Sequence, residues 1–304
     1  MSQRRVALLA LFLTALLPRL SAMEVEEGGL RLVLHQGSGR FSLYFDSVSL
    51  FVDQDPRTSG LSLYIDNKVV KLGEGGEFRE SAEMDAAGLR FNWRSKRLTV
   101  SENFSFGIPA GLSSPKGLVI DITLTNTSDR DLNVGLRFLL DTYLGEESYP
   151  HFQTESDREI NSELEYSRGN MPASWLSAAG KTEGAVGLQG FLKGDALTVP
   201  DRIVFANWKR LSEAPWGYVA SPARNFSDLP YSINDSALCQ YYDPEPLASK
   251  ASRSIRLFLA PLMGPSASVQ AAEAAASEEL SSLAEAGTSY VDTLALVGDI
   301  KVLN

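Results

Sequence analysis

The sequence contains a long series of short apolar segments separated by turns of glycine, proline, asparagine and aspartate. The first pair is Leu30–His35 and Phe41–Phe45, joined by the turn Gly37–Gly39. Alternation of apolar and polar residues is typical of a strand with one buried face, and a glycine-rich connection between two such segments predicts a β-hairpin. The chain after about residue 23 is therefore expected to be an antiparallel β protein.

Further segments of this kind follow at regular spacing. The other predicted strands are Leu61–Ile65, Val69–Leu72, Leu89–Trp93, Leu98–Phe106, Leu118–Asn126, Trp175–Ser177, Ala185–Phe191, Arg202–Trp208, Ser236–Tyr242 and Ser254–Leu259. Residues 153–168 are polar and predict a surface loop or a short helix. So many strands without alternating helices favour a mainly β fold, a large two-sheet antiparallel β-sandwich over residues 23–262.

The stretch Leu136–Leu144 is the best candidate for the central strand, because its apolar character is nearly continuous. The polar turn after Leu118–Asn126 leads directly into it, so we expect these two strands to pair. Asp141 stands at the strand's end. We predict that Asp141 and Arg137 are structural, with the buried carboxylate held by backbone N–H groups, Arg137 or Arg210.

Residues 1–22 have the three parts of a secretory signal peptide: Arg4 and Arg5, an apolar stretch, and small residues before a cleavage point after Ala22. The apolar stretch is too short to span a bilayer. We therefore expect a periplasmic or secreted protein with no transmembrane span after cleavage. Residues 263–304 read as a proline- and glycine-containing linker and a C-terminal helical tail, a candidate docking element.

Cleavage after Ala22 would remove three arginines and no acid, leaving 25 basic against 38 acidic side chains. This balance excludes nucleic acid as an expected partner. The single cysteine, Cys239, has no partner for an internal disulfide. Stability must therefore come from packing.

One loop brings an acid and a base near each other in sequence, since His151 follows Asp141 by ten residues. They could converge on a small molecule, although a histidine that only stabilises the loop is the plainer interpretation. The acidic residues from Glu146 to Glu165 could supply oxygen ligands for calcium, but they lack the EF-hand pattern, and a solvated acidic face is favoured. We therefore predict no metal, cofactor or catalytic residue.

An aromatic stretch from Phe205 to Tyr242 carries the candidate binding surface. Its rings stand beside charged and amide side chains, as in sugar-binding grooves and protein-binding surfaces. Loops whose rings only pack on the sheet are a third interpretation, and the sequence leaves all three open. The candidate binding residues are Trp208, Arg210, Trp216, Tyr218 and Asp235, together with His151.

Three runs also resemble a family: GLRFLLDTYLGE (Gly135–Glu146), ANWKRLSEAPW (Ala206–Trp216) and LPYSINDSALCQYYDP (Leu229–Pro244). They are similar to exported proteins of spirochaetes. The resemblance implies a periplasmic location and a large β-sandwich of the supersandwich kind found in galactose mutarotase. Mutarotases use two histidines and a carboxylate, and neither His35 nor His151 occupies a matching motif.

These observations predict an exported, non-enzymatic structural or interaction protein of the cell envelope. The resemblance implies an envelope or flagellar protein as its partner, because spirochaete flagella run through the periplasm. The alternative is a carbohydrate-binding or carbohydrate-modifying β-sandwich with a glycan as ligand.

Overall fold

The computed structural model describes residues 23–54, 56–86, 88–146, 150–180 and 185–263. The predicted signal peptide and nearly all of the predicted tail lie outside the described residues. Within the described part of the chain, no helix is long and apolar enough to cross a membrane.

Strands dominate the described residues. They are β1 (Met23–Glu27), β2 (Leu30–His35), β3 (Arg40–Phe45), β4 (Val48–Ser49), β5 (Gly60–Ile65), β6 (Lys68–Lys71), β7 (Arg79–Asp85), β8 (Gly88–Arg94), β9 (Leu98–Gly107), β10 (Gly117–Asn126), β11 (Leu132–Leu140), β12 (Gln153–Thr154), β13 (Leu164–Ser167), β14 (Ser174–Ala178), β15 (Val186–Phe191), β16 (Arg202–Asn207), β17 (Ser236–Leu247) and β18 (Ser252–Met263). The helices are η1 (Arg168–Asn170) and α1 (Trp208–Glu213).

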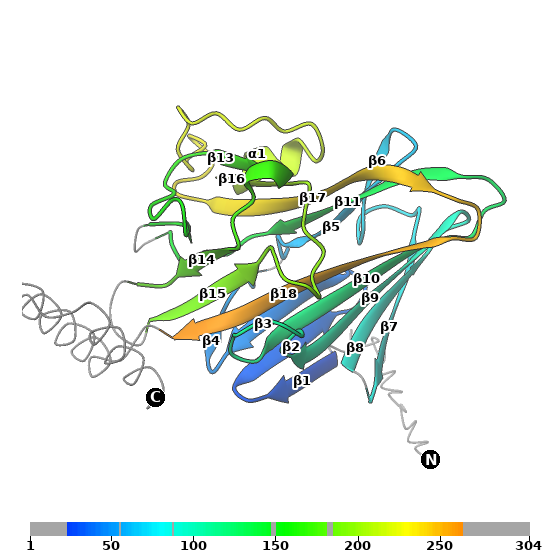
Figure 1. The fold of residues 1–304 in the computed structure, drawn as a ribbon, viewed down its shortest axis with the longest axis horizontal. Helices are drawn as coiled ribbons and strands as arrows, with labels where there is room; N and C mark the ends of the chain where they lie inside the picture. Colours follow the sequence, from blue (N-terminus) through cyan, green and yellow to red (C-terminus); the bar gives the residue numbers. More distant parts are fainter. Residues whose placement is uncertain (1–22, 55, 87, 147–149, 181–184, 264–304) are drawn as a thin grey trace, which may run out of the picture.

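The strands form three antiparallel sheets that pack as a sandwich (Figure 1). The smallest sheet has the order β1-β2-β3-β4, the largest β12-β14-β15-β18-β10-β9-β8-β7, and the third β13-β16-β17-β11-β5-β6. The predicted mainly β sandwich is confirmed, with its strands divided among three sheets rather than two. The polar stretch 153–168 contributes the short strands β12 and β13 instead of only a loop or a helix.

One continuous hydrophobic core joins the three sheets. Phe41 of β3 lies where they meet, with its ring centroid 5.2 Å from that of Phe104 in β9 and 6.1 Å from that of Phe138 in β11. The predicted β2–β3 hairpin forms with His35 opposite Arg40. At the end of its turn Gly39 has φ +58°, and a Cβ there would lie 1.9 Å from the Trp93 ring. Glycine is therefore required at this turn.

A central strand is present as predicted, but it is β11 at Leu132–Leu140 and thus begins and ends four residues before the predicted Leu136–Leu144. It lies between β17 and β5 and is buried along nearly its whole length. Because side chains alternate across a strand, Leu136, Phe138 and Leu140 contact the main core, whereas Leu139 belongs to a second cluster on the other face. Arg137 shares that outer face with Leu139. The functional candidates described below lie on this outer face.

The expected pairing of the strand ending at Asn126 with the central strand is wrong. β10 pairs with β9 and β18 in the largest sheet, whereas β11 lies in the third sheet. The turn between β10 and β11 therefore crosses from one sheet to another, and the buried Asn126 side chain is bonded to both sides of the crossing. Asn126 donates to the carbonyls of Arg130, Leu247 and Ala248, at 2.8, 2.9 and 3.1 Å.

Candidate functional site

Helix α1 and the loop that follows it cover the outer face of the third sheet (Figure 1). Asn207 caps the helix by accepting the N–H of Arg210 at 3.2 Å. Its Nδ2 donates to the carbonyls of Phe226 and Asp235, at 2.7 and 3.0 Å. One buried amide therefore joins the start of the helix to the loop at residues 214–235.

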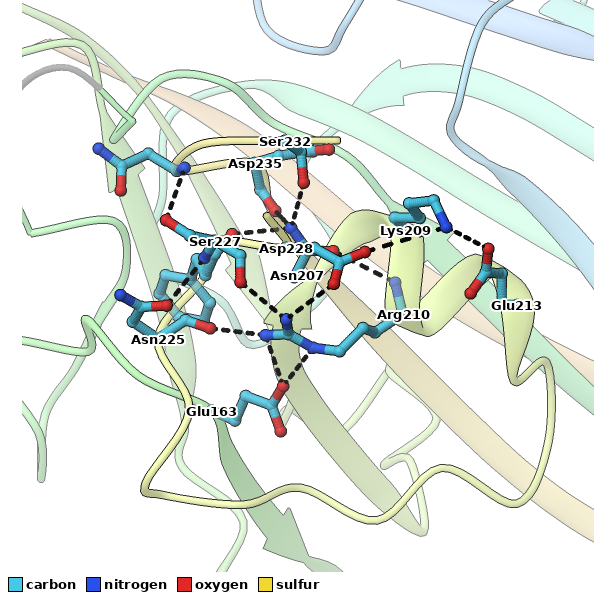
Figure 2. Close-up of polar contacts among 12 residues, drawn as sticks. Glu163, Asn207, Lys209, Arg210, Glu213, Asn225, Ser227, Asp228, Ser232 and Asp235 are labelled. Atoms are coloured by element: carbon cyan, nitrogen blue, oxygen red, sulfur yellow. Dashed lines mark hydrogen bonds and ion pairs between the residues drawn. The ribbon is translucent and has the colours of Figure 1, made fainter. Parts of the chain in front are cut away.

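Arg210 holds the same loop from the other side (Figure 2). Its guanidinium donates to the carbonyl of Ser227 at 2.8 Å and to that of Asn225 at 2.6 Å. It also pairs with Glu163, a fully buried carboxylate that accepts the Tyr218 hydroxyl at 2.6 Å. Of the candidate binding residues, Arg210 and Tyr218 are thus engaged within the fold, and Tyr218 is buried.

Trp208, by contrast, borders a cavity of about 280 Å³ between α1 and the strands β5, β6 and β11. Its indole N–H points to the carbonyl of Thr58 at 3.4 Å. Of the predicted residues, Trp208 and Arg137 line this cavity. The other lining residues are Ser38, Arg40, Pro56, Arg57, Thr58, Gly60, Leu61, Ser62, Lys71, Gly73, Glu74, Leu139 and Ser212.

The lining of this cavity, called here the Arg137 pocket, is strongly cationic although the whole chain is acidic. Four cations, Arg40, Arg57, Lys71 and Arg137, face one carboxylate, Glu74, among the described lining residues. Glu74 accepts a hydrogen bond from Arg40 at 3.0 Å and lies 3.8 Å from Lys71. Outside the lining, Asp53 pairs with Arg57 at 3.0 Å. These two acids together offset only part of the positive charge of the four cations.

Arg137 is the most buried of these cations, at 1% exposure. Its Nη2 donates to the carbonyl of Leu211 at 2.7 Å, which fixes the guanidinium beneath α1. Its Nε is buried and finds no hydrogen-bond acceptor among the described residues. The side chains of Cys239 and Tyr241 lie beside the guanidinium and stabilise its charge.

Trp216 lies apart from the pocket lining and packs on the sheet. Its ring centroid is 5.1 Å from that of Tyr64 and 5.8 Å from that of Tyr241. Gly135 makes room for it, since a Cβ there would lie 2.9 Å from the indole. Packing, the plainest of the three interpretations of the aromatic stretch, describes Trp216.

The two residues predicted to converge from one loop, Asp141 and His151, are both buried. His151 Nδ1 lies 2.9 Å from Ser236 Oγ, and burial lowers the pKa of His151 to about 4. The N–H of Ser236 donates to Glu146 at 2.8 Å. Glu146 in turn lies in a carboxylate cluster with Asp141 and Asp235, whose oxygens are within 4.8 Å of one another.

The expected side-chain partners of Asp141 are wrong. Arg137 donates to Leu211 and Arg210 pairs with Glu163, so neither reaches the Asp141 carboxylate. The backbone N–H of Asp141 donates to Ser59 Oγ at 2.9 Å, while Oδ1 is buried with no hydrogen-bond partner among the described residues. Burial raises the pKa of Asp141 well above its ordinary value, and the charges of Asp235 and Glu146 raise it further.

The loop after α1 also presents a group of exposed apolar side chains. Between Arg210 and β17, four large side chains are 73–79% exposed: Val219, Leu229, Tyr231 and Ile233. The Lys209 ammonium lies 4.7 Å from the centroid of the Tyr231 ring. We call these four residues the apolar loop patch.

Sequence reasoning missed most of the Arg137 pocket. Arg40, Arg57 and Lys71 come from segments more than sixty residues before Arg137, and only the sheet topology brings them together. The one available signal was an arginine at an interior position of an apolar strand. The carboxylate cluster likewise combines a strand end, a loop and the residue before β17.

No protein-family model and no curated protein sequence matches the chain. Among solved structures, a galactose mutarotase-like protein from Lactobacillus casei ATCC 334 matches with 10% identity and a TM-score of 0.47, over 80% of this chain and 100% of that one. A polysaccharide lyase matches with 13% identity and a TM-score of 0.40, over 80% of this chain and 32% of that one. A candidate kojibiose phosphorylase from the human microbiome matches with 12% identity and a TM-score of 0.33, over 90% and 29%.

Proposed function

We propose that the protein binds an acidic carbohydrate in the Arg137 pocket. The observation that carries this proposal is the composition of the lining, with four cations and the Trp208 indole around a cavity of about 280 Å³. That volume is near the lower end of ligand sites and suits a single sugar unit or a chain end. This is a form of the carbohydrate-binding alternative.

Each part of the lining has a matching part on such a ligand. Guanidinium groups bind carboxylates through two parallel N–H···O bonds, and Lys71 adds a point charge. The Trp208 ring offers an apolar surface to the C–H face of a sugar. The hydroxyls of Ser62 and Ser212 and the Glu74 carboxylate line the same cavity and can exchange hydrogen bonds with sugar hydroxyls.

The proposal is tested by calorimetric titration with glucuronate and galacturonate, using glucose and galactose as neutral counterparts. We expect the acidic sugars to bind and the neutral ones to bind more weakly, with an affinity that falls as salt rises. Equal affinity for neutral and acidic sugars, or no binding of either, would contradict the proposal.

Two lysines of β6 provide a matched pair of variants. Lys71 lines the pocket, whereas Lys68 does not line it and pairs with Glu77. Lys71→Gln and Arg57→Gln should weaken binding of the acidic sugar, and Lys68→Gln should leave it unchanged. If Lys68→Gln and Lys71→Gln reduced the affinity for the acidic sugar equally, the cause would be general electrostatic attraction to the protein surface rather than binding in this pocket.

A second candidate function, contact with a partner protein, is favoured by the apolar loop patch. Exposed apolar side chains gathered on one loop are typical of protein-binding sites. The Arg210 and Asn207 hydrogen bonds hold this loop in place, so a partner would meet a preformed surface. If the expected export takes place, that partner would be a protein of the cell envelope.

Site-specific photo-crosslinking tests this second function. A photoreactive residue at Tyr231 should capture one defined partner in cells, and Ile233→Asp in the same chain should abolish the capture. Met84, 62% exposed on β7, gives the control position and should capture nothing specific. Identical products from both positions would argue against a binding role for the loop.

A further inference from the structure

Three carboxylates from separate segments of the chain lie close together at one end of the third sheet's central strand. Asp141 follows β11, Glu146 lies in the next loop, and Asp235 directly precedes β17. One oxygen from each lies within 4.8 Å of the others. Neither Asp141 nor Asp235 pairs with a lysine or arginine of the described residues, although Asp141 is only 2% exposed.

A second, independent observation concerns single atoms. Asp141 Oδ1 and the hydroxyl oxygen of Thr58 are both buried, and neither makes a hydrogen bond of good geometry among the described residues, although the two side chains interact with each other. Buried polar atoms in native proteins are satisfied with few exceptions, and a buried carboxylate oxygen is among the costliest to leave bare. Asp141 is the most buried side chain of the cluster, and its Oδ1 is available to bind a ligand.

The carboxylates are also held in position by the fold. The backbone N–H of Asp141 is bonded to Ser59 Oγ at 2.9 Å, and one oxygen of Glu146 accepts the N–H of Ser236 at 2.8 Å. The backbone carbonyl of Asp235 accepts the N–H of Trp208 at 2.9 Å. Carboxylates on fixed backbone segments favour ion binding, because little conformational entropy is lost when the ion binds.

We propose that Asp141, Glu146 and Asp235 form a binding site for a divalent cation, and that the cation is calcium. All available ligand atoms are oxygens, which suit calcium and magnesium better than zinc or copper. Calcium accepts irregular sets of oxygen ligands such as three carboxylates from separate segments, whereas magnesium requires a near-ideal octahedron and keeps several of its waters. The Thr58 hydroxyl supplies a further neutral ligand. The site adjoins the Arg137 pocket, whose lining also includes Thr58, but the calcium proposal does not depend on the sugar-binding proposal.

The experiment uses the protein after EDTA treatment and dialysis, titrated with calcium chloride by calorimetry and followed by thermal unfolding. Calcium at roughly a hundredfold excess over its Kd should raise the wild-type Tm by about 5 °C or more. Asp141→Asn and Glu146→Gln should each weaken calcium binding by about tenfold or more and lose most of this rise. The exposed Glu159→Gln should behave like the wild type.

The same variants separate ion binding from a merely structural role. In ion-free buffer Asp141→Asn removes a buried charge and two repulsions, so it should melt at or above the wild-type temperature. Wild-type protein that neither binds calcium nor gains stability from it would overturn the site. So would undiminished calcium binding in Glu146→Gln and Asp141→Asn, and tighter binding of magnesium than of calcium would overturn the choice of ion.

Discussion

The guanidinium of Arg210 contacts one oxygen of the buried Glu163 carboxylate through both Nε and Nη2, each at 2.8 Å. The second carboxylate oxygen accepts the N–H of Ser221 at 2.9 Å. This pair links β13, α1 and the loop that bears the apolar patch. The Glu163 side chain is 0% exposed, and a carboxylate buried to this degree is stable only with such partners. Because Arg210 is also bonded to the loop, the pair holds the loop on the sheet.

Removal of either partner should destabilise the domain. We expect Glu163→Gln and Arg210→Ala each to lower the free energy of unfolding by about 3 kcal/mol, because a buried charge or hydrogen-bond donor loses its partner. Urea unfolding monitored by circular dichroism measures this. The exposed neighbour Glu213→Gln, which removes the pairing with Lys209, should leave the midpoint unchanged. Equal midpoints for all of these proteins would show that the network does not contribute to stability.

A second stability prediction concerns the crossing between sheets at Asn126. Its amide makes three donor contacts, and its oxygen accepts the N–H of Ser128 at 2.9 Å. Asn126→Ala leaves three carbonyls without this donor and should cost about 3 kcal/mol. Asn126→Asp should be worse, because a carboxylate cannot donate to carbonyls.

Thr125→Ala, which removes only a surface contact with Ser252, is the control for Asn126. Its urea midpoint should stay close to that of the wild type. If Asn126→Ala unfolded at the same urea concentration as Thr125→Ala, the Asn126 amide would not stabilise the segment between β10 and β11.

A buried acid in β9 predicts the pH dependence of stability. Burial raises the pKa of Glu102 from 4.5 to about 8, although the charge of Arg40 opposes this. Between these two values the folded protein holds a proton that the unfolded chain has lost. The contribution of Glu102 to stability is therefore largest below pH 4.5 and falls as pH rises towards 8, by up to about 1.4 kcal/mol per pH unit. The buried His151 acts in the opposite direction between pH 4 and 6.5.

Glu102→Gln should flatten this part of the profile and raise the Tm at pH 8 relative to the wild type. Thermal unfolding at several pH values between 4.5 and 8 measures the effect. The exposed Glu83→Gln on β7 should keep the wild-type slope. A Glu102→Gln profile as steep as that of the wild type would place the titrating group elsewhere.

The sequence predicted the strands far better than their arrangement. The central strand β11 was recognisable because Leu136, Phe138 and Leu140 on one face and Leu139 on the other are all apolar, a local property. The pairing of β10 was mispredicted because the short turn suggested a hairpin. Only the long-range bonds from Asn126 to residues 247 and 248 show that the chain changes sheets there.

For the candidate site, too, the sequence identified single residues but not the residues that surround them. Trp208 and Asp235 were found from local composition, but neither the cations that surround Trp208 nor the acids beside Asp235 are near them in sequence. Asp141 was predicted to be buried and is. Its expected partner Arg137, on the same strand, donates instead to the Leu211 carbonyl of α1, a contact between segments far apart in the sequence. Sequence spacing carries no information on that geometry.

The two tryptophans near α1 allow binding and packing to be separated. Trp208 lines the Arg137 pocket, whereas Trp216 packs against Tyr64 and Tyr241 without lining it. Trp208→Ala should reduce the affinity for glucuronate at least about tenfold with a small effect on stability. Trp216→Ala should lower the free energy of unfolding by about 2 kcal/mol, because its half-buried ring leaves a gap on the sheet, while affinity at low temperature stays within about twofold.

Calorimetry with glucuronate and urea unfolding, run on the same two variants, decide between these roles. The opposite pattern, with affinity lost only in Trp216→Ala, would move the sugar site to the outer face around Tyr64 and Tyr241. Trp208→Phe completes the comparison, since it keeps an aromatic face but loses the N–H directed at Thr58. If the ring face binds the sugar, this variant should retain most of the affinity that Trp208→Ala loses.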